Sequence, residues 1–146
     1  MRLTHTIFVV FIASFLIQFF AIPLVNVSQT LHVTHNLGKA YIATIFALSL
    51  VILEVILHDY QYNVMSTKLY ALFGGSIALF IYLYKKQIAV DDKQFVEGMI
   101  EHQSQSLLTS QAILKKTNDY NITKLAKNII QTQKDQIHIM QELLRK

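Results

Sequence analysis

One ionisable residue lies in an apolar setting, where it could do chemistry. Glu54 is the only charged residue of the apolar run Ala40–Leu57, and His58 follows it four residues later. An ionised carboxylate at the centre of a bilayer costs at least about 2.5 kcal/mol, so an acid there is usually paired, protonated or functional. Glu54 lies one turn from the end of its run. This position favours an interfacial Glu54–His58 ion pair over an ion or proton site.

A His-x-x-His pair, His32 and His35, lies in the polar segment that follows the first apolar run. Such a pair can share a helical face and bind a metal ion when further ligands complete the site. No carboxylate or thiol lies nearby in the sequence, so a metal site is disfavoured here. The chain has no cysteine, which excludes disulfides, thiolate metal sites and thiol nucleophiles.

A third polar group lies in the C-terminal part, where apolar residues recur at helical spacing on both sides of Thr117–Tyr120. Antiparallel pairing of two helices across that turn places His102 level with Gln136, and Ser106 near Gln133. We expect His102, Gln133 and Gln136 to form a hydrogen-bonded polar layer inside an apolar seam. Such a layer fixes the register of the helices and the choice of partner.

This hairpin has predicted ends and a predicted inner face. Asp91 and Gln94 fit a capping box at the start of its first helix, and Asn121 is expected to cap the second. The residues expected to face inward are Phe95, Met99, His102, Ser106 and Ile113, with Val96, Ile100 and Leu107 beside them, and on the second helix Ile122, Leu125, Ile129, Gln133, Gln136, Ile137, Met140 and Leu144.

Three long apolar segments precede the hairpin. A helix rises about 1.5 Å per residue, so roughly 20 apolar residues cross a hydrocarbon layer about 30 Å thick. No small-x-small cleavage site follows the first segment, which favours a retained anchor over a cleaved signal peptide. Small residues, Ala43 with Ala47 and Ala71 with Gly75, predict close packing of helices within the chain. The predicted transmembrane helices are Thr6–Val25, Ala40–His58 and Lys68–Tyr84.

The sequence therefore predicts an all-α multi-pass membrane protein, with a transmembrane region over residues 1–88 and an extramembrane hairpin over residues 89–146. The net charge is +4 and the basic residues are dispersed. This pattern argues against nucleic-acid binding and suits anionic lipid headgroups. Lys39, Lys85 and Lys86 flank one side of the membrane, and Arg2 and Lys68 the other. The positive-inside rule thus favours a cytoplasmic C-terminal domain.

The hairpin carries Asp92-Lys93-Gln94-Phe95 and Met99-Ile100-Glu101-His102 in its first helix, and Leu125-Ala126, Ile129-Ile130, Gln133, Ile137 and Met140 in its second. In these residues it resembles the ferritin-like family called domain of unknown function 305, over roughly residues 91–144. The resemblance implies a ferritin-like helical fold. Some membrane members of that family have three preceding helices with a glutamate in the second, like Glu54. Several members are linked to copper or other metal handling.

The chain departs from the family pattern at the positions that would carry metal chemistry. Gln103, Thr109 and Gln136 replace a histidine, a methionine and a glutamate of the pattern, and neutral amides are poor ligands for transition metals. The resemblance leaves Met99, His102 and Met140 as candidate Cu(I) ligands, with His138 close in sequence. We expect no tightly bound cofactor, with copper as the alternative.

No nucleophile–base arrangement, phosphate loop or paired inward carboxylates appear in the sequence, so we expect no enzyme activity. We expect a structural or assembly protein whose hairpin mediates homo-oligomerisation, as a dimer, with Ile129 and Ile137 at the interface. The alternatives are a membrane-anchored protein that handles copper or another metal, and a small transporter or channel accessory built around Glu54. The many Lys, Asn, Ile and Tyr residues suggest an AT-rich genome, as in bacteria and large DNA viruses, so a viral membrane is one expected setting.

The three-span topology can be tested by labelling single cysteines, since the chain has none of its own. Ser28→Cys and Asn118→Cys should react from one side of the membrane and Asn63→Cys from the other, because three crossings separate the loops in that way. The measurement is reaction with a membrane-impermeant maleimide in sealed vesicles. Labelling of positions 28 and 63 from the same side would exclude three spans.

Overall fold

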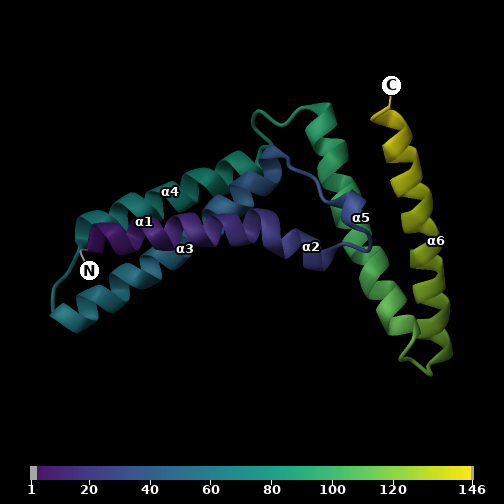
Figure 1. Cartoon of the computed structure of the whole chain (residues 1–146), viewed down its shortest axis with the longest axis horizontal. Helices are drawn as coiled ribbons and strands as arrows, with labels where there is room; N and C mark the ends of the chain where they lie inside the picture. The colour runs from purple at the N-terminus through teal and green to yellow at the C-terminus, as the bar shows by residue number, and fades with distance from the viewer. Residues whose placement is uncertain (1–2, 146) are drawn as a thin grey trace. The chain divides into compact units, whose positions relative to one another are not determined.

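The computed structural model describes residues 3–145, and every regular element in that range is helical (Figure 1). This confirms the predicted all-α class. The chain forms two compact units, one from residues 3–21 and 37–90, the other from residues 22–36 and 91–145. The elements are α1 (Leu3–Leu16), the π-helical turn η1 (Ile17–Ala21), α2 (Ile22–Asn26), the 3-10 turn η2 (Thr30–His32), α3 (Leu37–Tyr62), α4 (Thr67–Lys85), α5 (Asp92–Leu114) and α6 (Tyr120–Leu143).

Three helical stretches are long and apolar enough to cross a membrane: Leu3–Asn26, Leu37–Tyr62 and Thr67–Lys85. They contain the three apolar runs, each extended by a few residues. The first stretch widens into the π-helical turn η1 just before Pro23. Proline has no amide hydrogen and its ring crowds the carbonyl four residues earlier, so a local departure from α-helical geometry relieves the conflict.

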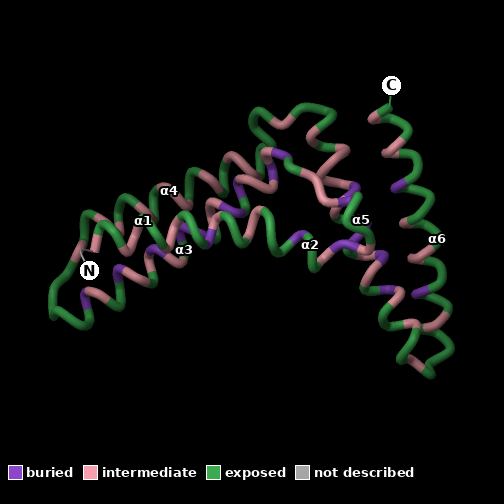
Figure 2. The backbone as a smooth tube through the Cα atoms, viewed as in Figure 1, coloured by how far each residue is buried: buried purple, intermediate pink, exposed green. Residues whose placement is uncertain are grey.

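In the first unit, α3 is the central helix, and α1 and α4 both pack against it. Four of its small or β-branched residues, Ala43, Ala47, Val51 and Val55, are fully buried. Figure 2 shows buried positions recurring along the helix. The prediction that Ala43 and Ala47 form a packing face is therefore confirmed. The corresponding prediction for α4 is wrong: Gly75 is exposed, and a Cβ built there meets no atom of the described residues within 4 Å.

In the second unit, α5 is the central helix: it contacts α6, α2 and η2. Residues 22–36 thus group with the hairpin, although the predicted division placed them in the region 1–88. The reason is chemical, because polar side chains of this segment hydrogen-bond to α5 (described below). The apolar core consists of Ile100, Leu107 and Ile137, with Val96, Ile130, Met140 and Leu144 packed against it.

Both hairpin helices begin at an aspartate. Asp91 Oδ1 accepts a hydrogen bond from the Gln94 amide at 2.8 Å, so the predicted cap is confirmed. The reciprocal half of the capping box is not made, because Gln94 Oε1 is buried without a partner among the described residues. The prediction for α6 is wrong: Asp119, not Asn121, is the cap, and it accepts from the Ile122 amide at 2.9 Å.

The side-chain carbonyl oxygen of Gln133 is also buried without a partner among the described residues, which leads to a prediction about the stability of the hairpin. Gln133 lies in the hairpin seam with its Oε1 buried. Because such an acceptor costs about 1–3 kcal/mol, Gln133→Met should raise the stability of the hairpin by an amount of that order. Hydrogen exchange of the α5 and α6 amides in the full-length protein measures it.

Gln105→Met provides the control, since Gln105 is exposed on α5 and its replacement should change stability by less than about 0.5 kcal/mol. A loss of protection in Gln133→Met would show that the Gln133 side chain has a stabilising partner in the protein.

Candidate functional site

In the second unit, a buried serine on α5 binds the segment that follows α2. The Ser104 hydroxyl is 2.9 Å from both the amide nitrogen and the hydroxyl oxygen of Ser28, and 2.8 Å from His32 Nδ1. Ser104 is 0% exposed. A serine hydroxyl offers one donor and two acceptor lone pairs, so these contacts use its full capacity. The Ser104–His32 contact joins two segments of the chain that are far apart in sequence.

A second set of contacts continues the attachment of this segment to α5. Thr34 donates from its backbone amide to Glu101 Oε2 at 3.0 Å and from its hydroxyl to the Glu97 carbonyl at 3.1 Å. Asn36 is buried, and a Cβ built on Gly98 would come within 3.4 Å of Asn36 Nδ2. The small residue on α5 therefore lets the segment approach closely.

The two histidines of the His-x-x-His pair have different surroundings. His32 is buried beside Ser104, whereas His35 is exposed. Burial removes water from the His32 ring and lowers its pKa, because the imidazolium form loses solvation that the neutral form does not need. His32 is thus held in the neutral form as part of the attachment to α5.

The predicted polar layer is not found in the seam of a single hairpin. His102 and Gln136 are exposed, and of the three residues Gln133 alone lies in the seam. The inner face of α5 also differs from the prediction. Phe95 and Ile113 are exposed, while Ile100, Ser104, Leu107 and Ser110 are buried. The cause is that α5 is covered by two neighbours, α6 and residues 22–36, so its buried surface is wider than one stripe.

The candidate metal ligands differ in their surroundings. Met140 packs against the hairpin core and Met99 is half-buried, whereas His102 and His138 are exposed. The His138 Nδ1 atom lies 3.6 Å from Glu142 Oε1. Within residues 3–145, no three His, Asp or Glu side chains gather closely enough to hold a metal ion.

In the first unit, His58 has a different partner from the predicted one. His58 Nδ1 lies 3.3 Å from Asp59 Oδ1, and Glu54 is half-buried within α3. The buried Asp59 carboxylate also accepts hydrogen bonds from the Ser66 amide at 2.6 Å, the Ser66 hydroxyl at 2.8 Å and the Tyr70 hydroxyl at 3.0 Å. It therefore fastens the end of α3 to the start of α4. Sequence reasoning missed Asp59 because its partners lie across a turn.

The predicted inner face of α6 separates into two stripes. The inner stripe faces α5 and consists of Ala126, Ile130, Gln133, Ile137, Met140 and Leu144. The outer stripe lies next to it and recurs every three or four residues. It consists of Ile122, Leu125, Ile129, Thr132, Gln136, Ile139 and Leu143.

The outer stripe is open in the single chain. Four of its apolar members are 42–58% exposed: Ile122, Leu125, Ile139 and Leu143. The alternation of three and four residues is the spacing by which helices pair in coiled coils and bundles. This arrangement can bind another helix, and in Figure 2 many positions along α6 have the colour of exposed residues.

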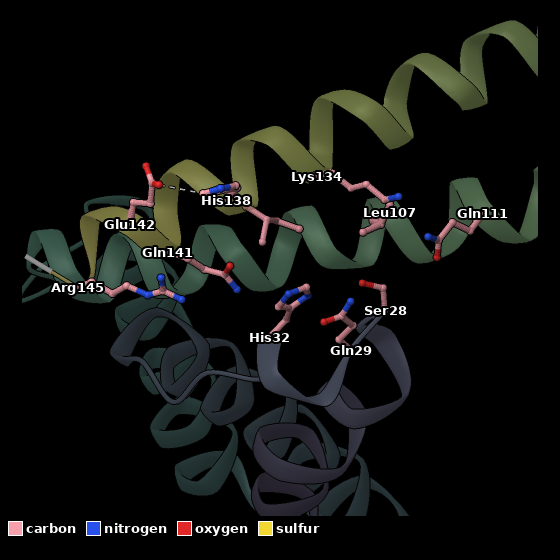
Figure 3. Close-up of a pocket in the computed structure, with 11 residues that line it drawn as sticks. Ser28, Gln29, His32, Leu107, Gln111, Lys134, His138, Gln141, Glu142 and Arg145 are labelled. Carbon is pink, nitrogen blue, oxygen red and sulfur yellow. Dashed lines mark ion pairs between the residues drawn. The ribbon is translucent and has the colours of Figure 1, made fainter.

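A pocket of about 510 Å³ also lies within the second unit, where side chains of the 28–32 segment, α5 and α6 converge (Figure 3). Its wall includes His32 and Gln29 from the segment, and Lys134 and Gln141 from α6. None of the sequence patterns predicted this pocket, because it needs the segment to lie against the hairpin.

Residues 92–146 match the family described as domain of unknown function (DUF305). The chain is also 37% identical over 68 residues to an uncharacterized protein of Acanthamoeba polyphaga mimivirus. That match covers 47% of this chain and 45% of the viral protein, so the chain spans less than half of the relative's length. No solved structure matches the chain significantly.

The buried His32 makes the attachment of residues 28–36 dependent on pH. On α5, Glu101 and Glu97 accept hydrogen bonds from Thr34 of the same segment, and on α6, Lys134, His138 and Glu142 line the pocket that His32 also lines. Above about pH 6.5 His32 is neutral whether residues 28–36 are attached or unfolded, so protonation does not weaken their attachment. As the pH falls below that value, His32 binds a proton more readily in the unfolded state, because burial lowers its pKa in the folded state. The free energy that favours attachment of residues 28–36 therefore declines.

We therefore expect hydrogen-exchange protection of residues 28–36, corrected for intrinsic rates, to fall between about pH 7 and pH 5. His32→Gln should remove this dependence, whereas His35→Gln, at the exposed member of the pair, should keep it. An unchanged pH profile in His32→Gln would assign the effect to another group.

Proposed function

We propose that this chain is a multi-pass membrane protein of structural or assembly type, in which α6 joins a second copy of the chain. The three apolar helices support the membrane part of the proposal. Three crossings would leave the loop after the first helix and the C-terminal hairpin on the same side. The hydrogen bonds of Ser28 and His32 to Ser104 are consistent with that arrangement, because both partners must share one compartment.

The observation that carries the proposal is the open outer stripe of α6. Leu125, Ile139 and Leu143 are each more than half exposed, although they recur at the spacing of a helix-pairing seam. A solvated loop or a single apolar residue on a surface needs no partner, but a stripe that runs the length of a helix is typical of an interface. A second hairpin would complete a four-helix bundle.

The flanking charges favour an antiparallel, twofold pairing of the two α6 helices. Asp135 and Glu142 border the outer stripe in its second half, and Asn121 and Asn128 occupy the equivalent positions in its first half. Antiparallel pairing brings each acid opposite an asparagine of the other copy and keeps the acids apart. A twofold interface uses the same patch on both copies, which suits a self-complementary stripe.

The proposal assigns no reaction to the chain. The positive-inside rule favours a cytoplasmic hairpin. The viral relative is in keeping with a viral membrane as one setting, since the similarity extends over nearly half of this chain.

Charged substitutions within the outer stripe test the assembly. Leu125→Glu and Ile139→Glu should convert the dimer to a monomer, because a buried unpaired carboxylate costs several kcal/mol. Both positions are exposed in the single chain, so each variant should still fold. Lys127→Glu, an exposed position on another face of α6, should leave the dimer intact. The measurement is the mass of the detergent-solubilised protein by light scattering. A wild-type monomer at high concentration would refute the proposal.

Cysteine cross-linking tests the direction of pairing, and the absence of native cysteine leaves no background. In an antiparallel pair the midpoint of the stripe meets itself, so Thr132→Cys should form a disulfide-linked dimer. Leu125→Cys should cross-link to Ile139→Cys and not to itself. Self-linking of Leu125→Cys, without a cross-link between positions 125 and 139, would indicate parallel pairing and contradict the antiparallel arrangement.

A further inference from the structure

The pocket of the second unit has the composition of an anion site. It is about 510 Å³ in volume and is assembled from three parts of the chain: the 28–32 segment, α5 and α6 (Figure 3). Volumes of this size are typical of sites for small ligands. Lys134 and Arg145 supply two positive charges to its wall, and Glu142 is the one carboxylate among the described residues that line it.

The carboxylate lies next to a histidine, and the two form an ion pair when His138 is protonated. Glu142 Oε1 lies 3.6 Å from His138 Nδ1, and Figure 3 shows the two side chains directed toward each other. The lysine and arginine have no such partner on the pocket wall among the drawn residues. The excess of donors over acceptors therefore favours a negatively charged occupant.

The remaining polar groups can also donate. His32 is 5% exposed, and its Nδ1 is hydrogen-bonded to Ser104, which leaves Nε2 to contact a ligand. Gln29 and Gln141 add amide groups from opposite sides of the pocket. Leu107 and Ile137 supply an apolar portion of the wall, on which the uncharged part of a ligand could lie.

We propose that this pocket binds a phosphate group, carried either by a lipid headgroup or by a small soluble phosphate. Phosphate accepts several hydrogen bonds at once, and arginine binds it with two parallel N–H donors. Lysine adds a point charge, and the buried histidine holds one side of the site rigid through Ser104.

The site does not depend on the proposed dimer. The pocket residues Lys134 and Gln141 lie on the face of α6 opposite the outer stripe of Leu125 and Ile139, as the helical spacing of 3.6 residues per turn requires, and Arg145 follows the end of the helix. A variant can therefore lose phosphate binding and remain a dimer, and another can become a monomer and still bind phosphate.

The test uses the full-length protein in an uncharged maltoside detergent that contains no phosphate. One arm titrates inorganic phosphate and follows binding by calorimetry. The other adds phosphatidic acid, with phosphatidylcholine as the zwitterionic comparison, and counts retained lipids by native mass spectrometry. Saturable binding in the first arm identifies a soluble phosphate, and selective retention of phosphatidic acid identifies a lipid source.

Lys134→Gln and Arg145→Gln should each weaken the binding about tenfold or more, because each removes a charge-assisted hydrogen bond. Lys127→Gln is the matched control: it removes the same charge from the same face of α6, two turns earlier and outside the pocket. Its affinity should stay within about twofold of the wild type. No binding in either arm, or an equal loss in Lys127→Gln and Lys134→Gln, would overturn the proposal.

Discussion

The attachment of residues 28–36 to α5 is centred on one hydroxyl group. Ser104 is fully buried on α5, and Ser28 and His32 both bind it. A buried polar group without partners would cost about 1–3 kcal/mol, so the attachment of the 28–36 segment and the burial of Ser104 require each other. Because the segment covers one side of α5 and α6 covers another, the central helix has both of its neighbours within the same chain.

This arrangement decides where the chain can interact with other molecules. A two-helix hairpin of this length is too small to bury both apolar faces of its helices. The segment 22–36 supplies the missing cover for α5, while the outer stripe of α6 has none among the described residues. The same segment completes the wall of the pocket with His32 and Gln29. The position of residues 22–36 therefore completes the pocket, and it covers α5 while leaving the outer stripe of α6 uncovered. By sequence alone, this segment only joins two apolar helices.

The sequence predicted the elements well because their signals are local. Charge-free length identifies the three apolar helices, and Asp91 identifies the start of α5. Contacts between distant residues could not be predicted in this way. Ser104 and His32 are 72 positions apart, and serine is common on exposed helix faces, so no spacing rule joins them. The pairing of His58 with Asp59 was missed because the helical rule pairs residues three or four positions apart, which favours Glu54 over the adjacent Asp59.

The two stripes of α6 show why the predicted inner face contained both buried and exposed residues, although the helical periodicity was correct. The inner and outer stripes are displaced by one residue, as Leu125 and Ala126 illustrate, and one residue turns the helix by about 100°. A pattern of apolar residues every three or four positions therefore includes residues of both the inner and the outer stripe. Only burial separates them, because Ala126 is 3% exposed and Leu125 is 54% exposed. The core lies on one face of α6, the outer stripe on a second and the charged pocket residues on a third, and Ile137 contributes to both the core and the pocket wall. The proposed assembly and ligand binding would therefore use largely different side chains. A change confined to the outer stripe or to the charged pocket residues should leave the other proposed function in place.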